Sequence, residues 1–149
     1  MKNSRPDIAA LFEDESKKDD IKVPNVDPST TIMYHWEKVA RRMMQNLMKH
    51  PKAMMLFNEP VDAIKLNIPD YHQIITQPMD FGTIDRNLRS HKYVSMKKFL
   101  EDVELVFNNA YNYNGQESSV SVMTREVETE YNNLCNQLNA GFYLTDADN

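Results

Sequence analysis

Apolar side chains recur at steps of three and four residues in four separate segments of the chain. The first segment opens after Pro28, with Ser29 or Thr30 as its expected N-cap, and stops at His50-Pro51. Its apolar positions are Met33, Trp36, Ala40, Met43 and Leu47. This spacing places all of them on one face of an α-helix, so we expect a helix with one buried face.

Three later segments repeat this spacing. The second has Asp80 as its expected N-cap, the third begins at Ser95, the fourth begins near Ser118, and Gly141 is well placed as the C′ residue that ends it. Their inward positions are Phe81, Ile84 and Leu88, then Phe99, Val103, Val106, Phe107 and Ala110, then Val120, Met123, Val127, Tyr131, Leu134 and Leu138. No segment alternates long enough for a strand, so the pattern predicts an all-α bundle of four helices.

A proline-rich stretch separates the first two predicted helices. Prolines at positions 51, 60, 69 and 78 each fix φ and remove a backbone donor, so about 28 residues should form one long connection without regular helix. Such long loops are uncommon in compact domains and are usually functional. The stretch is rich in apolar residues, namely Met55, Leu56, Phe57, Val61, Leu66, Ile68, Tyr71, Ile74, Ile75 and Met79. We therefore expect an ordered, packed loop that builds a pocket.

The 149 residues fit one domain with short tails. Residues 1–28 are charged and poor in large apolar side chains, which predicts disorder, and residues 142–149 form a short C-terminal tail. Residues 8–12 could form one amphipathic turn. We interpret this segment as part of a frayed tail rather than as a docking motif. The folded domain is expected over residues 29–141. We see no signal peptide or membrane-spanning segment and expect an intracellular, soluble protein.

Charge and cysteine content limit the chemistry. The net charge of −5 suits a basic peptide partner better than non-specific nucleic-acid binding, which calls for a basic patch. The patch of Lys38, Arg41 and Arg42 is therefore interpreted as a solvated face rather than a DNA contact. Cys135 is the single cysteine and the four histidines lack metal-ligand spacing, so no metal or other cofactor is expected. No serine has a convincing base, and we expect no enzyme.

Asn114 is the strongest candidate for a binding side chain, because it ends the third predicted helix, where an amide can project into a cleft. A primary amide offers two donor hydrogens and an acceptor oxygen. Considered alone, Asn114 is interpreted more readily as a C-terminal cap, since asparagine tolerates the left-handed conformation.

The wider motif reverses that interpretation. The chain contains Phe57-Asn58-Glu59-Pro60-Val61-Asp62, Leu66-Asn67-Ile68-Pro69-Asp70-Tyr71, Ile74-Ile75, Pro78-Met79-Asp80, Gly82-Thr83-Ile84 and Asn109-Ala110-Tyr111-Asn112-Tyr113-Asn114. These stretches resemble the bromodomain family of acetyl-lysine readers over roughly residues 30–140, and the loop is most similar to the BET branch. The resemblance implies a left-handed four-helix bundle with a long ordered loop between the first and second helices.

The resemblance also implies the role of each site residue. The match to Asn114 donates to the acetyl carbonyl, and the match to Tyr71 binds that carbonyl through an ordered water. Val61, Leu66 and Ile68 match the loop wall of the pocket. Phe57 matches its floor, Tyr113 matches its side and Val120 matches its gatekeeper. The family's Trp-Pro-Phe shelf is Met55-Leu56-Phe57 here, and His72 stands where family members often have tyrosine or asparagine.

The function implied is a nuclear chromatin reader that binds acetylated histone tails as a monomer, with chromatin-complex proteins as further candidate partners. We expect an acidic rim of Glu59, Asp62, Asp70 and Glu117 around the pocket mouth. The alternative is a degenerate bromodomain fold that acts as an adaptor and binds proteins independently of acetylation. The presence of both Asn114 and Tyr71 favours a working reader.

Overall fold

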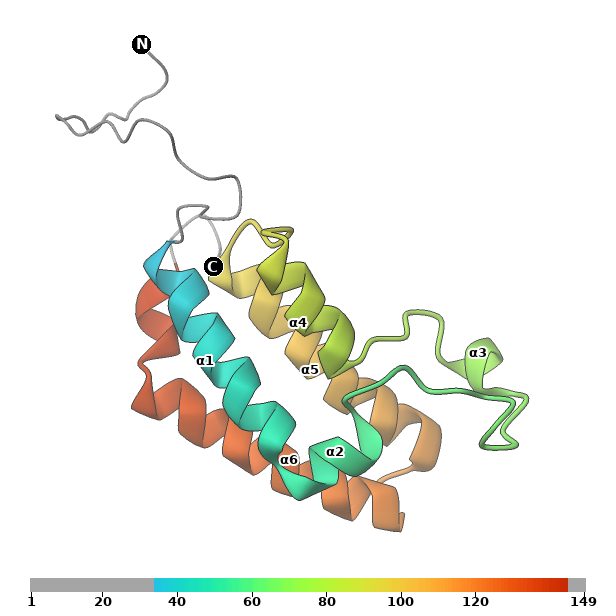
Figure 1. Cartoon of the computed structure of the whole chain (residues 1–149). Coiled ribbons are helices and arrows are strands. Elements are labelled where there is room, and N and C mark those ends of the chain that lie inside the picture. The colour runs from blue at the N-terminus through green and yellow to red at the C-terminus, as the bar shows by residue number, and fades with distance from the viewer. Residues whose placement is uncertain (1–33, 145–149) are drawn as a thin grey trace, which may run out of the picture. The chain divides into compact units, whose positions relative to one another are not determined.

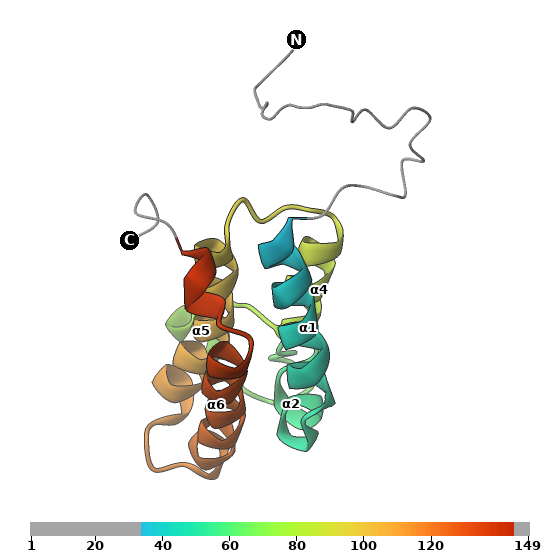
Figure 2. The same cartoon turned by 90° about the vertical axis from the view of Figure 1, so that its left-hand side faces the viewer.

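The computed structural model describes residues 34–144. These residues form α1 (His35–Lys49), α2 (Pro51–Leu56), α3 (Tyr71–Ile74), α4 (Phe81–Arg89), α5 (Met96–Asn114), α6 (Ser119–Gln137) and the 3-10 helix η1 (Ala140–Tyr143). No strand occurs within residues 34–144. Helices α1, α4, α5 and α6 pack alongside one another (Figures 1 and 2), and α2 continues α1 across a bend. The prediction of an all-α four-helix bundle is confirmed.

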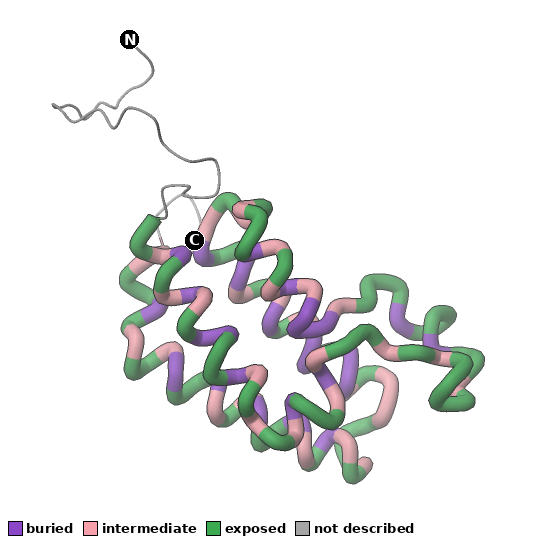
Figure 3. The backbone as a smooth tube through the Cα atoms, viewed as in Figure 1, coloured by how far each residue is buried: buried purple, intermediate pink, exposed green. Residues whose placement is uncertain are grey.

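The core of the bundle lies between the inward faces of these four helices, where the buried positions face one another (Figure 3). Its largest fully buried side chains include Phe81, Phe99, Phe107, Met43 and Met44. Each of these large apolar side chains contributes about 1.5–3 kcal/mol when it is removed from water. Trp36, which we expected in the core, is half-buried and packs against it.

Three predicted helix starts are confirmed by their hydrogen bonds. The side chains of Asp80, Ser95 and Ser118 each accept from the backbone N–H three residues further on, at 3.0, 3.3 and 3.0 Å. Each side chain thereby satisfies one of the amide donors that the first turn of a helix leaves free. Helices α4, α5 and α6 begin directly after these residues.

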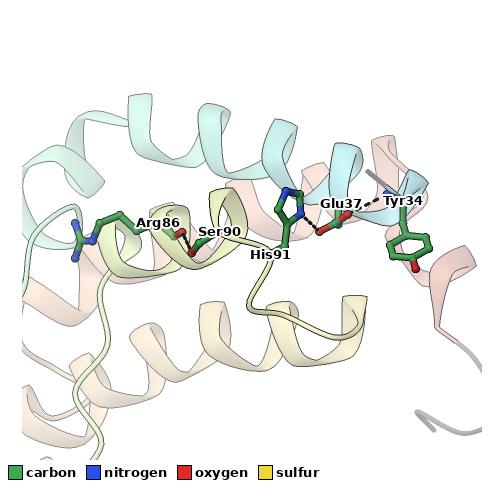
Figure 4. A network of polar contacts seen from close by, with 5 residues as sticks. All are labelled: Tyr34, Glu37, Arg86, Ser90 and His91. Carbon is green, nitrogen blue, oxygen red and sulfur yellow. Dashed lines mark hydrogen bonds and ion pairs between the residues drawn. The ribbon is translucent and has the colours of Figure 1, made fainter. Parts of the chain in front are cut away.

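Helix α1 begins at His35, whereas Ser29, Thr30 and Met33 of the predicted first helix lie outside the described residues, as do the predicted tail of residues 1–28 and residues 145–149. The start of α1 is held by a buried carboxylate (Figure 4). Glu37 is 3% exposed, and its Oε1 accepts from the Tyr34 backbone N–H at 2.9 Å. Its Oε2 lies 2.9 Å from Nδ1 of His91, which has φ 57° in the α4–α5 connection. This pair joins the start of α1 to that connection.

The long connection contains more helix than the prolines suggested. Pro51 is the first residue of α2, and the His50 ring accepts from the Lys52 backbone N–H at 3.1 Å. A proline is tolerated in a first helical turn, because its missing N–H would have had no intrahelical partner there. Helix α3 forms one turn between Pro69 and Pro78. The prediction that the prolines exclude regular helix was therefore wrong at these two places.

The loop of residues 57–80 extends away from the end of the bundle and is mostly exposed (Figures 1 and 3). Ile64, Leu66 and Ile74 are 93%, 59% and 50% exposed, whereas Tyr71 and Ile75 are buried. The expectation of a packed loop therefore holds for only part of it.

The end of α6 differs from the prediction. Leu138 is its C-cap, and Asn139, with φ 54°, takes the left-handed position that we assigned to Gly141. Gly141 lies instead within η1. Asparagine can adopt this conformation because its short polar side chain tolerates it. Tyr143 and Leu144 continue past this point and pack against the core.

The buried face of α6 also differs from the prediction in its first two turns. Ser121 and Thr124 are fully buried there, whereas Val120 and Met123, which we expected inward, are half-buried. The Thr124 hydroxyl donates to the Val120 carbonyl at 2.8 Å, and the Ser121 hydroxyl donates to the Gly115 carbonyl. Backbone acceptors therefore satisfy both hydroxyls without water, so the two polar residues can be buried.

Candidate functional site

A cavity of about 480 Å³ lies where the loop of residues 57–79 meets the end of α5 and the start of α6. This volume is within the usual range of small-molecule pockets. All ten residues that the sequence assigned to a binding site line this cavity, namely Met55, Leu56, Phe57, Val61, Leu66, Ile68, Tyr71, Tyr113, Asn114 and Val120. The structure therefore brings together side chains from the loop and from three helices.

Phe57 joins the cavity to the bundle core. Its side chain is 6% exposed and its ring lies 5.6 Å from the ring of Phe81 and 6.1 Å from that of Phe107. The Phe57 carbonyl accepts from the Phe81 backbone N–H at 2.7 Å, which ties the end of α2 to the start of α4. The tilted and edge-on ring contacts are those that aromatic pairs prefer. This wall of the cavity is consequently part of the rigid core.

The loop wall is shaped by local turns. Asp62 Oδ1 accepts from the backbone N–H groups of Ile64 and Lys65 at 3.2 and 3.0 Å, an arrangement that favours a turn without tertiary support. Asn67 has φ 58°, and the Ile68 backbone N–H donates to the Ala63 carbonyl at 2.9 Å. These bonds fold the chain back so that Val61, Leu66 and Ile68 line one cavity.

Tyr71 and Tyr113 together form one side of the cavity. Their ring centres lie 5.0 Å apart, and the Tyr113 hydroxyl donates to Asp70 Oδ1 at 2.6 Å. Tyr71 is 6% exposed, and burial raises the pKa of its phenol above the ordinary value of 10.0. The hydroxyl therefore stays protonated at neutral pH and can donate a hydrogen bond. Within residues 34–144 it makes no hydrogen bond.

Asn114 is the last residue of α5, and the helix ends because Gly115 adopts φ 81°. Gly115 thus ends the helix at its C-cap, so the alternative of Asn114 as a left-handed cap was wrong. One hydrogen of the Asn114 amide is donated to the Ala110 carbonyl at 2.9 Å. This bond fixes the side chain, and the amide retains a second donor hydrogen and its oxygen.

Sequence reasoning did not assign several other lining residues to the site. Val106 and Ala110 were expected only as core residues, and Met79 only as an apolar loop residue. Asn109 is 7% exposed and donates to the Gln77 carbonyl at 2.8 Å, which anchors the end of the loop to α5. Asn58 donates to the Met48 carbonyl at 2.9 Å. The carbonyl partners of these two asparagines could not be found from sequence spacing, because each bond spans ten or more residues.

Charged side chains occur in the lining only at exposed positions, namely Glu59, Asp62 and Lys65. Asp70 and Glu117, which we expected beside them, do not line the cavity, and Asp70 holds the Tyr113 hydroxyl instead. His72 packs edge-on against Tyr71, with ring centres 5.3 Å apart. The inner part of the cavity is therefore apolar, with Asn114 and Tyr71 among its few polar groups.

No group of three or more histidine, cysteine, aspartate or glutamate side chains is placed to hold a metal ion within the described part of the chain. None of the helices between residues 34 and 144 combines the length and the apolar character that a membrane span requires.

The fold and the cavity together define a helical bundle whose pocket lies between a long loop and the ends of two helices. A sequence model of the bromodomain family matches residues 40–126, more than half of the chain. The protein therefore belongs to the bromodomain family.

Relatives with established names agree with this assignment. The bromodomain-containing protein C631.02 of Schizosaccharomyces pombe is 32% identical over 140 residues, which cover 94% of this chain and 18% of that protein. The SWR1 complex bromodomain subunit bdf1 of the same organism is 41% identical over 91 residues, 61% of this chain and 16% of that protein. The bromodomain-containing protein bet-1 of Caenorhabditis elegans is 42% identical over 79 residues, 53% of this chain and 9% of that protein. The chain thus spans less than a fifth of the length of each relative.

Proposed function

We propose that this chain binds N-acetylated lysine through the cavity beside Asn114. The observation that carries the proposal is that the Asn114 amide and the Tyr71 hydroxyl, both able to donate, line the same apolar cavity. An acetyl carbonyl between them would accept from Asn114 directly and interact with Tyr71 through a water. The aliphatic part of the lysine would contact the loop wall.

Selectivity for the acetylated side chain follows from the burial of charge. An ammonium group in this cavity would lose its water without a carboxylate partner, because Glu59 and Asp62 lie at the exposed part of the lining. Burying an unpaired charge costs several kcal/mol even after relaxation. The neutral acetyl amide avoids that cost, whereas one hydrogen bond to its carbonyl contributes only about 0.5–1.5 kcal/mol net. Rejection of the charge therefore gives most of the selectivity, and Asn114 sets the orientation.

The natural ligands we propose are acetylated histone tails, read in the nucleus as part of chromatin regulation. Support comes from family membership and from the relative bdf1, whose name describes it as a subunit of the SWR1 complex. We propose a binding module rather than an enzyme. Affinity should be modest, because one anchored side chain buries little surface against the entropy cost of association.

The test is an array of acetylated and unmodified tail peptides, followed by calorimetric titration of the strongest ligand. Wild-type protein should bind only acetylated peptides. Asn114→Ala should weaken that binding about tenfold or more, since loss of the donor leaves a buried carbonyl unsatisfied at a cost of about 1–3 kcal/mol. Asn112→Ala is the matched control, because Asn112 is exposed on the same helix and does not line the cavity.

Two results would contradict the proposal. One is binding that ignores acetylation, which would favour the adaptor function. The other is unchanged affinity in Asn114→Ala protein whose thermal melting matches the wild type.

A further inference from the structure

Two neighbouring methionines lie at the entrance of the cavity. Met54 and Met55 belong to the last turns of α2, are 66% and 67% exposed, and both line the cavity. Every other methionine between residues 34 and 144 is less accessible. Met43, Met44 and Met96 are fully buried in the core, and Met48, Met79 and Met123 are half-buried. The thioethers most accessible to solvent are therefore also part of the proposed binding surface.

We propose that Met54 and Met55 are an oxidation site through which peroxide lowers the affinity of the pocket for acetyl-lysine. The inference rests on the proposed function and adds a form of regulation to the same site. It depends on the position of the two methionines, which are largely exposed to solvent and also line the cavity.

The chemistry requires one oxidant, a hydroperoxide such as hydrogen peroxide. A lone pair of the thioether sulfur attacks one peroxide oxygen and the O–O bond breaks. With hydrogen peroxide, the sulfur gains that oxygen and loses two electrons, while the departing hydroxide takes up the proton of the transferred oxygen and leaves as water. The product is methionine sulfoxide, which methionine sulfoxide reductases convert back to the thioether. Oxidation can therefore lower the affinity, and enzymatic reduction can restore it.

Cys135 is a poor competitor for the same oxidant. Its side chain is half-buried in α6, and burial is the largest cause of the raised pKa of its thiol. The thiolate, which is the reactive form, is consequently scarce at neutral pH. The core methionines are shielded by the surrounding helices. Oxidation should therefore begin at Met54 and Met55.

Oxidation would change the entrance from apolar and flexible to polar. A thioether contacts an aliphatic ligand without losing hydrogen bonds to water, whereas the sulfoxide oxygen is a strong acceptor that must be dehydrated when a peptide covers it. Dehydration of an unpaired polar group weakens association by about threefold to thirtyfold when partial compensation is possible. The contacts of Asn114 and Tyr71 deeper in the cavity would remain.

The experiment compares the protein before and after brief exposure to hydrogen peroxide. Peptide mapping by mass spectrometry should find oxygen on Met54 and Met55 before any appears on Met43, Met44 or Met96. Calorimetric titration with one acetylated histone peptide should then give a dissociation constant about threefold to thirtyfold higher in the oxidised protein. Treatment with methionine sulfoxide reductases should restore the original value.

Variants connect the effect to these two sulfur atoms. The readout is the ratio of affinities after and before oxidation within each variant, so that any change in the starting affinity cancels. In the double variant Met54→Leu, Met55→Leu this ratio should be close to one. Met123→Leu is the control, because Met123 is half-buried on α6 and does not line the cavity, and it should keep the wild-type ratio.

The outcomes separate the inference from the function on which it rests. Absence of acetyl-peptide binding before oxidation overturns the proposed function and this inference with it. Binding that is the same after Met54 and Met55 have been oxidised overturns this inference alone. A loss of affinity that persists in the double leucine variant also overturns it, because another group must then be responsible.

Discussion

At Gly82 the loop approaches α4 more closely than a side chain would permit. A Cβ atom built at this position would lie 2.5 Å from the Asn58 carbonyl oxygen and 3.1 Å from Asp80 Oδ2. The carbonyl belongs to the backbone and cannot rotate away as a side chain could. Because Asn58 lines the cavity, the missing side chain of Gly82 helps to set the position of the cavity wall.

We predict that Gly82→Ala destabilises the protein, although alanine is normally favoured over glycine within a helix. The helical preference is worth about 0.5–1 kcal/mol, whereas forcing extra atoms into a packed site costs about 1–3 kcal/mol. Urea denaturation should show a net loss of free energy of unfolding. Gly141→Ala is the matched control, since a Cβ there would meet nothing within 4 Å, and it should be nearly neutral. Equal stability of the two variants would mean that the close approach is not important.

The resemblance to the family aligns Met55 with the family's tryptophan, so we expect the entrance to lack a flat aromatic wall. We predict that Met55→Trp strengthens the binding of small aromatic ligands that stack at the entrance by roughly threefold to tenfold, because an aromatic contact adds about 0.5–1.5 kcal/mol beyond area burial. Acetyl-peptide affinity should change little. Titration of both ligands against both proteins tests this, and an equal gain for the peptide would contradict it.

At the residue scale, the motif that contains Asn114 and Tyr71 predicted that both residues contribute to one pocket, and both line the cavity. The sequence predicted that the helix ends at Asn114, and the positive φ that follows it belongs to Gly115. The bonds that hold Asn58 and Asn109 were not predictable, because their partners are backbone carbonyls brought near by the fold.

At the scale of elements, buried Glu37 and half-buried His91 join α1 to the α4–α5 connection, at the opposite end of α4 from the loop (Figure 4). Glu37 also accepts from the Tyr34 backbone N–H, so its loss would leave two donors without their partner. An exposed ion pair, such as Lys98 and Glu101, is screened by water and salt. The stability contributed by the two pairs should therefore differ.

We predict that Glu37→Ala lowers the free energy of unfolding by about 1–3 kcal/mol, because it removes two hydrogen bonds that each contribute about 0.5–1.5 kcal/mol net. His91→Asn should cost less, because asparagine also tolerates positive φ. A double-mutant cycle should give a coupling energy of at least about 0.5 kcal/mol. Glu101→Gln is the control and should leave the free energy of unfolding almost unchanged. Purely additive effects at Glu37 and His91 would mean that the contact does not contribute.

The predictions for elements succeeded where a local signal decided the structure. Asp80, Ser95 and Ser118 cap α4, α5 and α6 through bonds to amides only three residues away. The buried face of α6 was misassigned because Ser121 and Thr124 are polar, and only the fold places carbonyl acceptors beside them. Apolar periodicity identifies a helix more reliably than it identifies the buried face in every turn.

For the whole domain, the site depends on two regions that are far apart in sequence, residues 54–79 and residues 106–120. The loop, the end of α5 and the start of α6 meet at one end of the bundle, with α2 beside them. The sequence predicted that the loop would build a pocket, because a long proline-rich connection is unlikely to retain so many apolar residues without packing them. It could not predict that Ile64 would be 93% exposed, since the direction of a side chain in an irregular loop depends on turns such as the one at Asp62.

The charge around the cavity gives the last prediction. The net charge of the full chain is −5, and within the cavity lining Glu59 and Asp62 are exposed beside a single lysine, Lys65. A peptide rich in lysine and arginine around the acetylated residue should therefore be attracted to the entrance. Its affinity should fall as salt increases, because the Debye length shortens to about 10 Å at 0.1 M ionic strength.

Titration of such a peptide across salt concentrations should give a decline that is shallower in Glu59→Gln, with affinity at low salt about twofold weaker than in wild type. Asp62 is unsuitable for this test, because its carboxylate also holds the turn of the loop. Glu126→Gln is the matched control, since Glu126 is exposed on α6 and does not line the cavity, so it isolates the effect of position from that of net charge. If both variants change the salt dependence equally, attraction comes from the overall charge of the protein rather than from the entrance. Affinity that does not depend on salt would contradict both explanations.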